Sequence, residues 1–282
     1  MKMAHLIMAH KDPKQIERLV KKMCHQNFDF YIHVDKKVDI KDFEYLLAFE
    51  NVYFTKTRVL IRWGGYSFVE GILQCMKEIL KIHKPYDFIN LMSAQEYPIK
   101  PVEFIYNYFN NNIGKSFITL EDHNSKWWIE AEPRINTYHL TNFDFKGRYF
   151  IQKFINKILP KRKFPLPVTL YGGPCSSWWT FSMEMCKYVV ELIDTNPQFK
   201  RFAYFTWAPD EFLIPSIIMN SPLRNTIIED NFRYIDWTLG GANPKILTTR
   251  DFENIKTSNK FIARKFDIKV DTGVLDMIDT IT

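Results

Sequence analysis

The chain has few cysteines, and they do not form the pairs that mark zinc or dithiol sites. Its four cysteines lie at positions 24, 75, 175 and 186, and no two are spaced as Cys-x-x-Cys. There is also no His-Glu-x-x-His pair, no Gly-x-Ser-x-Gly elbow, no Gly-x-Gly-x-x-Gly loop and no Walker loop. The common zinc enzymes, serine hydrolases, dinucleotide-dependent enzymes and P-loop enzymes are therefore unsupported.

Long apolar runs are also missing. No stretch of about 20 apolar residues is present, and the first residues lead into an apparent strand instead of a signal peptide. We therefore expect a cytoplasmic protein with free thiols. The chain has 282 residues, of which 46% are hydrophobic, and no Gly/Ser-rich linker or internal repeat divides it. These features predict a single domain over residues 1–282.

The formal net charge is +6, which suits an anionic partner such as a nucleic acid, a lipid surface or a nucleotide diphosphate. The basic residues form no long arm, and we do not expect a nucleic-acid partner. The densest basic run contains Lys157, Lys161, Arg162 and Lys163, on either side of Pro160. We interpret it first as a solvated loop, and second as a weak peripheral contact with the inner membrane surface.

Aromatic residues are abundant, with 24 Phe, 14 Tyr and 7 Trp. Most of them are expected in the core. The adjacent pairs Trp127-Trp128 and Trp178-Trp179 are harder to bury together. We therefore expect these pairs to lie nearer a cleft, where a flat aromatic face can stack on a sugar ring.

Strand and helix patterns alternate over the first hundred residues. Apolar runs predict strands at residues 4–8, 30–34, 52–54, 59–61 and 88–92. Asp12 and Pro13 predict the start of one helix. Ser67 and Glu70 match a capping box at the start of a second helix, which Pro85 ends.

This alternation predicts a parallel sheet with ligands bound at the carboxyl ends of its strands. Polar residues follow two predicted strands at 33–37 and 93–98. Further along, strands are predicted at 117–120 and 179–181, and a helix at 183–194. Residues 242–270 have the pattern of a loop, a short helix and a basic-aromatic stretch.

Two acids, Asp210 and Glu211, follow Pro209 and precede an apolar run that contains Pro215. One interpretation is a pair of first-turn acids that interact with the helix dipole. The other is a carboxylate held at a helix start and facing a cleft, where it acts as a general base. Local sequence leaves both interpretations open, and Pro215 predicts a short or kinked helix.

Cations alternate with aromatics from Lys260 to Asp267, and Lys245 and Arg250 lie upstream. This stretch is either a surface strand with solvated charges or a group of cations that binds a phosphate-bearing ligand. Two glycine pairs add weaker signals. Residues 63–67 predict a tight turn at a ligand-facing end, and residues 171–179 predict a flexible loop that enters a strand and can turn a Trp edge toward a ligand.

In order along the chain, these segments resemble the core-2/I-branching beta-1,6-N-acetylglucosaminyltransferases and the related peptide O-xylosyltransferases. The resemblance is carried by residues 31–37, 63–67, 91–98, 208–211, 233–237 and 261–267. It implies a GT-A-like α/β nucleotide-binding fold, with a mixed, mostly parallel central sheet flanked by helices. It also implies a nucleotide-binding half at about 1–115 and an acceptor and diphosphate-binding half at about 116–282.

The resemblance implies inverting transfer of a sugar from a UDP-sugar donor to a hydroxyl of a glycan acceptor, without a cofactor or a divalent metal. N-acetylglucosamine is the preferred sugar, and xylose the alternative. No Asp-x-Asp pair follows a strand, so cations must neutralise the donor diphosphate in place of a metal. By resemblance, Glu211 is the catalytic base and Lys265 contacts the diphosphate.

The remaining site residues follow from the same resemblance. Val34 and Asp35 lie at the uridine-binding side. The second diphosphate-binding cation has no unambiguous match, which leaves Lys245, Arg250 and Arg264 as candidates. On the acceptor side the resemblance places Trp237. To it we add Asp210 and Trp178 from the local sequence, because the edge of a Trp in residues 171–179 is able to face the acceptor.

Animal members of this family have a membrane anchor, a stem and disulfides, and the present sequence shows none of these features. We therefore expect a bacterial, cytoplasmic relative that assembles a surface polysaccharide or a similar glycan. The alternative is a non-catalytic protein that binds a glycan or a nucleotide sugar on the same fold, because a fold alone does not define an activity.

Overall fold

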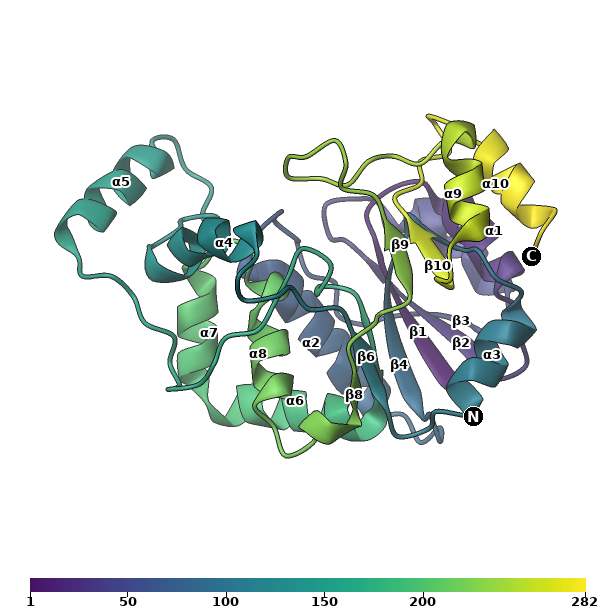
Figure 1. Cartoon of the computed structure of the whole chain (residues 1–282), viewed down its shortest axis with the longest axis horizontal. Helices are drawn as coiled ribbons and strands as arrows, with labels where there is room; N and C mark the ends of the chain where they lie inside the picture. Colours follow the sequence, from purple (N-terminus) through teal and green to yellow (C-terminus); the bar gives the residue numbers. More distant parts are fainter.

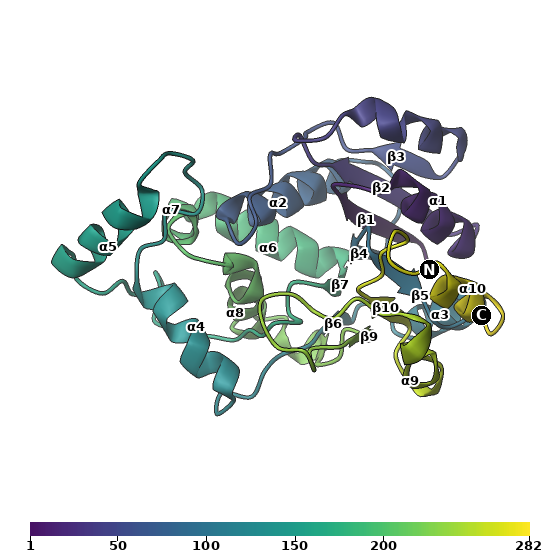
Figure 2. The same cartoon turned by 90° about the horizontal axis from the view of Figure 1, so that it is seen from above.

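A seven-stranded sheet with helices on both faces forms the centre of the computed structural model, which describes residues 1–282 (Figures 1 and 2). The strand order is β3-β2-β1-β4-β7-β6-β8, and only β7 runs antiparallel to its neighbours. A second sheet has the order β5-β10-β9. The predicted α/β fold with a mostly parallel central sheet is confirmed.

The strands are β1 (Met3–Ala9), β2 (Phe28–Val34), β3 (Val52–Phe54), β4 (Phe88–Ser93), β5 (Glu96–Pro98), β6 (Ser116–Ile118), β7 (Trp179–Ser182), β8 (Ile227–Ile228), β9 (Arg233–Ile235) and β10 (Ile262–Arg264). The α-helices are α1 (Pro13–Lys22), α2 (Tyr66–Leu80), α3 (Val102–Asn110), α4 (Lys126–Asn136), α5 (Arg148–Ile158), α6 (Met183–Thr195), α7 (Pro197–Tyr204), α8 (Leu213–Met219), α9 (Phe252–Thr257) and α10 (Gly273–Asp279). The 3-10 helices are η1 (Ile40–Ala48), η2 (Pro209–Glu211), η3 (Arg224–Thr226) and η4 (Thr249–Asp251).

The three central strands β1, β2 and β4 are buried at every position. Their near-continuous apolar runs are typical of parallel strands that are covered on both faces. Side chains alternate between two cores. One core packs β1 and β2 against α1, α9 and α10, and the other packs β1 and β4 against α2, α6 and α8. The two cores hold the carboxyl ends of these strands in fixed positions.

Two local predictions in the first hundred residues are wrong. Helix α2 has Gly65 at its N-cap, and no side chain caps it. The Ser67 hydroxyl instead accepts a hydrogen bond from the Arg62 backbone N–H at 2.8 Å, so the predicted capping box is absent. Residues 59–61 form no strand, because the Val59 N–H donates to His33 Nε2 at 3.0 Å and the Ile61 N–H donates to Asp35 Oδ1 at 3.4 Å.

Burial also corrects two predictions about side chains. Trp178 and Trp179 are 8% and 1% exposed, and Trp179 stacks on Phe181 in the core. Arg162 is buried, because its guanidinium donates hydrogen bonds to the backbone carbonyls of Thr137, Phe202 and Phe205. The basic run is therefore only partly the solvated loop that the sequence predicts. None of the helices is long and apolar enough to span a membrane.

A buried ion cluster joins the two sheets. Glu96 of β5 lies between Arg233 of β9 and Arg264 of β10, with N···O distances of 3.5 and 3.9 Å. The side chains of Glu96 and Arg233 are 0% and 1% exposed. Arg233 also donates to Asn90 Oδ1 of β4 at 2.5 Å and to the Leu91 carbonyl at 2.9 Å. The cluster therefore fixes the small sheet against the centre of the large one.

We predict that Glu96→Gln lowers the free energy of unfolding by about 3 kcal/mol, because it removes the carboxylate that pairs with Arg233 and Arg264 in the interior. Urea unfolding followed by circular dichroism measures the change. Glu44→Gln, at an exposed position of η1, is the matched control and should change the free energy by less than about 0.5 kcal/mol. Equal effects of the two substitutions would contradict the structural role of the cluster.

Candidate functional site

The carboxyl end of β2 carries the first predicted site residues. Val34 and Asp35 are each 1% exposed. Asp35 Oδ1 accepts a hydrogen bond from the Lys37 backbone N–H at 3.0 Å, and its Oδ2 lies 3.1 Å from the Lys37 ammonium. Arg58 donates to the Val34 and Asp35 carbonyls, both at 2.9 Å. This strand end is therefore rigid before any ligand binds.

A group of cations lies beside the carboxyl end of β1. Burial lowers the pKa of the Lys265 ammonium, and the positive charges of Arg264 and Lys11 lower it further. Burial also lowers the pKa of His10, and Lys37, Lys11 and Lys265 add to the shift. Lys11 pairs with Asp267 at 2.5 Å, whereas Lys265 makes no ion pair, and the charge of Asp267 only opposes the shift of the Lys265 pKa. A half-buried cation that makes no ion pair is a suitable partner for a bound anion.

The other three predicted cations differ from Lys265. The Lys245 ammonium lies 2.5 Å from Asp251 and 3.8 Å from Asp236, so it already has counter-charges. The backbone N–H of Leu247 donates to the Lys265 carbonyl at 2.8 Å, which brings the segment that carries Lys245 alongside Lys265. Arg250 is exposed on η4 and makes no ion pair.

Arg264 points into the interior. Its guanidinium carbon lies 4.3 Å from the centre of the Trp178 ring, and its Nε lies 3.9 Å from Glu96. Burial lowers the pKa of Arg264, while the nearby charges of Glu96 and Asp210 oppose that shift. Arg264 therefore links the cation group to the turn that carries Asp210. Trp178 packs against Arg264 and Phe68 and offers little open ring surface.

The turn that carries Asp210 and Glu211 is the short helix η2. Ala208 precedes it with a left-handed φ of 49°, and its N–H donates to the Gly64 carbonyl at 2.7 Å. The Gly173 N–H donates to the Glu211 carbonyl at 3.1 Å, and a Cβ on Gly172 would overlap that same carbonyl. Both glycine pairs singled out in the sequence thus contact this turn directly.

Glu211 is a largely buried carboxyl with one strong partner. Arg134 of α4 donates to Glu211 Oε2 at 2.6 Å, and the Glu211 side chain is 19% exposed. Burial and the neighbouring charge of Asp210 raise the pKa of Glu211 to about 7, although Arg134 opposes the shift. A carboxyl with this pKa is well matched to proton transfer near neutral pH.

The surroundings of Glu211 include residues that the sequence pattern did not identify. The Arg134 guanidinium carbon lies 4.5 Å from the centre of the Trp207 ring, which keeps the side chain in place. Asp210 Oδ2 accepts a hydrogen bond from the Ser177 hydroxyl at 2.6 Å, and burial raises its pKa. Ser177 lies in the singled-out segment 171–179, but the sequence pattern gives it no role of its own, and Arg134 stands in no recognisable motif.

Trp237, the third predicted acceptor-side residue, lies just beyond β9 and is half-buried. Its indole Nε1 is buried and has no hydrogen-bond partner. The Trp237 ring lies close enough to Cys175 to lower the pKa of that thiol, which burial raises. Trp237 is thus placed near the loop that leads to Ser177. No three His, Cys, Asp or Glu side chains lie together in an arrangement that could hold a metal ion.

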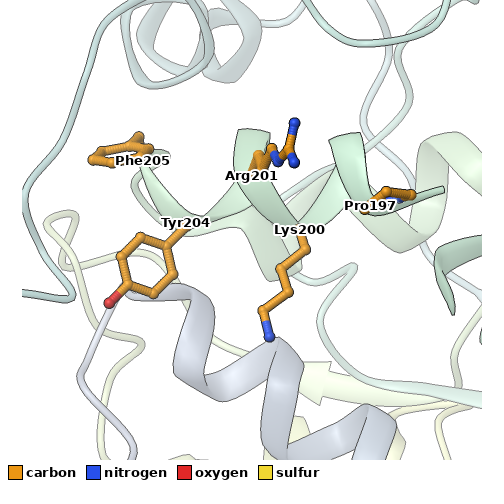
Figure 3. Close-up of a pocket in the computed structure, with 5 residues that line it drawn as sticks. All are labelled: Pro197, Lys200, Arg201, Tyr204 and Phe205. Carbon is orange, nitrogen blue, oxygen red and sulfur yellow. The ribbon is translucent and has the colours of Figure 1, made fainter.

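A separate hollow of about 380 Å³ lies along α7 (Figure 3). Its lining residues are Pro197, Lys200, Arg201, Tyr204 and Phe205. Lys200 extends toward α2, where its ammonium lies 3.6 Å from Glu70. None of the predicted site residues lines this hollow, so it is not part of the candidate site.

Comparison with known proteins gives a consistent picture. The family model described as Core-2/I-Branching enzyme matches residues 3–259. Xylosyltransferase 2 of Mus musculus is 26% identical over 300 residues, which cover 99% of this chain and 33% of that protein. A xylosyltransferase of Ciona intestinalis is 26% identical over 285 residues, which cover 94% of this chain and 32% of that protein. The chain thus spans about a third of the length of these relatives.

Among solved structures, the apo form of mouse xyloside xylosyltransferase 1 is similar to this chain, with a TM-score of 0.44 and 11% sequence identity. The alignment covers 93% of this chain and 97% of that chain.

We predict that Arg134→Gln raises the pKa of Glu211 by about one pH unit or more, because it removes the only cation in contact with the carboxylate. Carbon-13 NMR titration of labelled glutamate measures the pKa, and the spectrum of Glu211→Gln assigns the signal. Arg134→Lys retains a positive charge and should shift the pKa less. An unchanged pKa in Arg134→Gln would show that the ion pair does not form in solution.

Proposed function

The chain belongs to the Core-2/I-Branching enzyme family, and from this premise we propose that it is an inverting glycosyltransferase that moves a sugar from a UDP-sugar to a hydroxyl of a glycan acceptor. The observation that carries the proposal is the buried carboxyl of Glu211, whose pKa is raised to about 7. The proposal is further supported by the half-buried Lys265 ammonium, which makes no ion pair in the structure.

Glu211 acts as the general base in this proposal. Its carboxylate takes the proton of the acceptor hydroxyl while the hydroxyl oxygen attacks the anomeric carbon of the donor sugar. The bond between that carbon and the diphosphate oxygen breaks on the opposite face, so the configuration inverts and UDP leaves. Arg134 keeps part of the Glu211 population ionised below pH 7, and the incoming hydroxyl competes with Arg134 for the carboxylate.

Lys265 stabilises the negative charge that develops on the departing UDP. Fixed cations are most effective where water is excluded, and Lys265 is half-buried. Lys11 lies close enough to Lys265 to lower its pKa, so bound diphosphate would relieve repulsion between these two cations. In this proposal the cations supply the charge that a divalent metal supplies in other transferases, and catalysis is metal-independent.

Two sugars are candidates for the donor. The sequence favours N-acetylglucosamine by its resemblance to the branching transferases. The relatives described above carry the name xylosyltransferase, which supports xylose. We propose that UDP-N-acetylglucosamine or UDP-xylose is the donor, and both belong in the assay. The acceptor is proposed to be a glycan hydroxyl, placed near Trp237 and the Asp210–Ser177 pair.

We predict that Glu211→Gln lowers the transfer rate by about 10²- to 10⁴-fold, because the amide cannot accept the acceptor proton. UDP release from each donor, measured with a panel of saccharide acceptors, gives the rate, and calorimetry shows that UDP affinity is retained. In the unsubstituted chain the rate should fall as the pH drops below about 7, where Glu211 becomes protonated. Glu130→Gln, at an exposed position of α4, is the matched control.

Three results would each contradict part of the proposal. Retained turnover in Glu211→Gln would remove Glu211 as the base. Loss of activity in EDTA that manganese restores would refute metal independence. Binding of UDP-sugars with neither transfer nor hydrolysis by the unsubstituted chain would favour a non-catalytic binding protein.

A further inference from the structure

Helix α5 (Arg148–Ile158) extends away from the rest of the molecule, and the two views agree on this position (Figures 1 and 2). None of its residues is buried. Tyr149 and Phe150 are 69% and 78% exposed, values that are unusual for aromatic side chains of a globular protein. The core therefore does not explain why this helix is apolar.

The polarity of α5 is the reverse of that expected for a surface helix. Gln152 accepts a hydrogen bond from the Leu140 N–H at 2.9 Å. Asn156 accepts one from the Tyr138 N–H at 2.7 Å and donates one to the Tyr138 carbonyl at 2.8 Å. These two polar residues lie four positions apart and thus share one face of the helix. The polar face is turned toward the protein.

The opposite face is apolar and open to solvent. Phe150, Phe154 and Ile158 also follow one another at intervals of four, and they are 78%, 57% and 60% exposed. A soluble helix normally turns such a stripe toward the core and its amides toward water. The hydrogen bonds that Gln152 and Asn156 make with the backbone of Tyr138 and Leu140 fix α5 in the reversed orientation, so specific contacts hold the apolar stripe outward.

Positive charge surrounds this stripe. Residues 145–163 contain no Asp or Glu, and their basic residues are Lys146, Arg148, Lys153, Lys157, Lys161, Arg162 and Lys163. Only Arg162 of this set is buried. Lys153 and Lys157 are exposed on α5 itself, three residues after Phe150 and Phe154 respectively. An exposed apolar stripe flanked by lysines has the two features that bind a helix to an anionic lipid surface.

We propose that the outer face of α5, formed by Phe150, Phe154, Ile158, Lys153 and Lys157, docks on an anionic lipid bilayer with the helix axis parallel to the membrane plane. The helix has 11 residues and is about 16 Å long, so it can lie in the interface but cannot cross the bilayer. Phe150, Phe154 and Ile158 enter the boundary between headgroups and acyl chains. The lysines remain among the lipid phosphates.

Charge favours an anionic bilayer over a second copy of the chain as the partner of this face. A symmetric dimer through α5 would place Lys153 and Lys157 of the two copies close together, with no acidic residue in residues 145–163 to neutralise them. Anionic lipid headgroups supply the missing negative charge. The proposal does not depend on the assignment of Glu211 or Lys265, because none of the α5 residues takes part in that site.

Vesicle co-sedimentation of the whole chain tests the proposal, with phosphatidylcholine vesicles alone or mixed with phosphatidylglycerol. We expect binding to the mixed vesicles, weaker binding to the neutral ones and a loss of binding as salt increases. The double substitution Phe150→Ser with Phe154→Ser should weaken binding by about tenfold or more. The double substitution Lys153→Gln with Lys157→Gln should also weaken binding to the anionic vesicles, by about fivefold for each lysine removed.

The matched control is Leu47→Ser with Ile113→Ser, two apolar residues that are 50% and 53% exposed outside α5. It should bind vesicles as the unsubstituted chain does. The proposal is overturned if the unsubstituted chain does not bind anionic vesicles, or if both α5 variants bind as tightly as the control. It is also overturned if light scattering without lipid shows a dimer that the Phe150 and Phe154 substitutions dissociate, because the face would then join two copies.

Discussion

The ion cluster of Glu96, Arg233 and Arg264 is the interaction on which the rest of the architecture depends. It connects all three strands of the small sheet, and Arg233 extends the connection to β4 through Asn90. Charges buried to this extent are stable only when each keeps its partners. Since Arg264 directly precedes Lys265, the same cluster that joins the sheets also sets the position of the free ammonium beside the carboxyl end of β1.

The environment of each carboxyl, more than its residue type, determines what the site can do. Asp251 forms an ion pair with Lys245, and Asp267 forms one with Lys11. These pairs lower the pKa values of both carboxyls. Glu211 lies beside a second acid, and burial together with the charge of Asp210 raises its pKa to about 7. The backbone contacts made by both glycine pairs hold its turn in that place. The fold therefore supplies both a candidate base, Glu211, and a cation without an ion pair, Lys265.

The sequence predicted the parts that follow from short-range pattern. Buried apolar runs predicted β1, β2 and β4, and the Pro-Asp-Glu motif directed attention to Glu211. Prediction from the sequence failed where contacts between residues far apart in the chain determine the position of a side chain. Ser67 looks like a helix cap but bonds to Arg62, Arg162 looks solvated but bonds to buried carbonyls, and Trp178 looks like an acceptor platform but packs on Arg264. No local pattern singles out Arg134, because its partner lies 77 residues away.

In the proposed site, Lys265 binds the diphosphate of UDP without a metal ion. Thermal unfolding with UDP, in the presence of EDTA, measures this binding, because a ligand that binds only the folded chain stabilises it by about 2.7 kcal/mol at 100 times its dissociation constant. We expect UDP to raise the melting temperature equally with and without EDTA. We also expect Lys265→Ala to lose most of the increase, while the exposed-site variant Lys256→Ala retains it. No response to UDP, or an equal response in Lys265→Ala, would show that Lys265 does not bind the diphosphate.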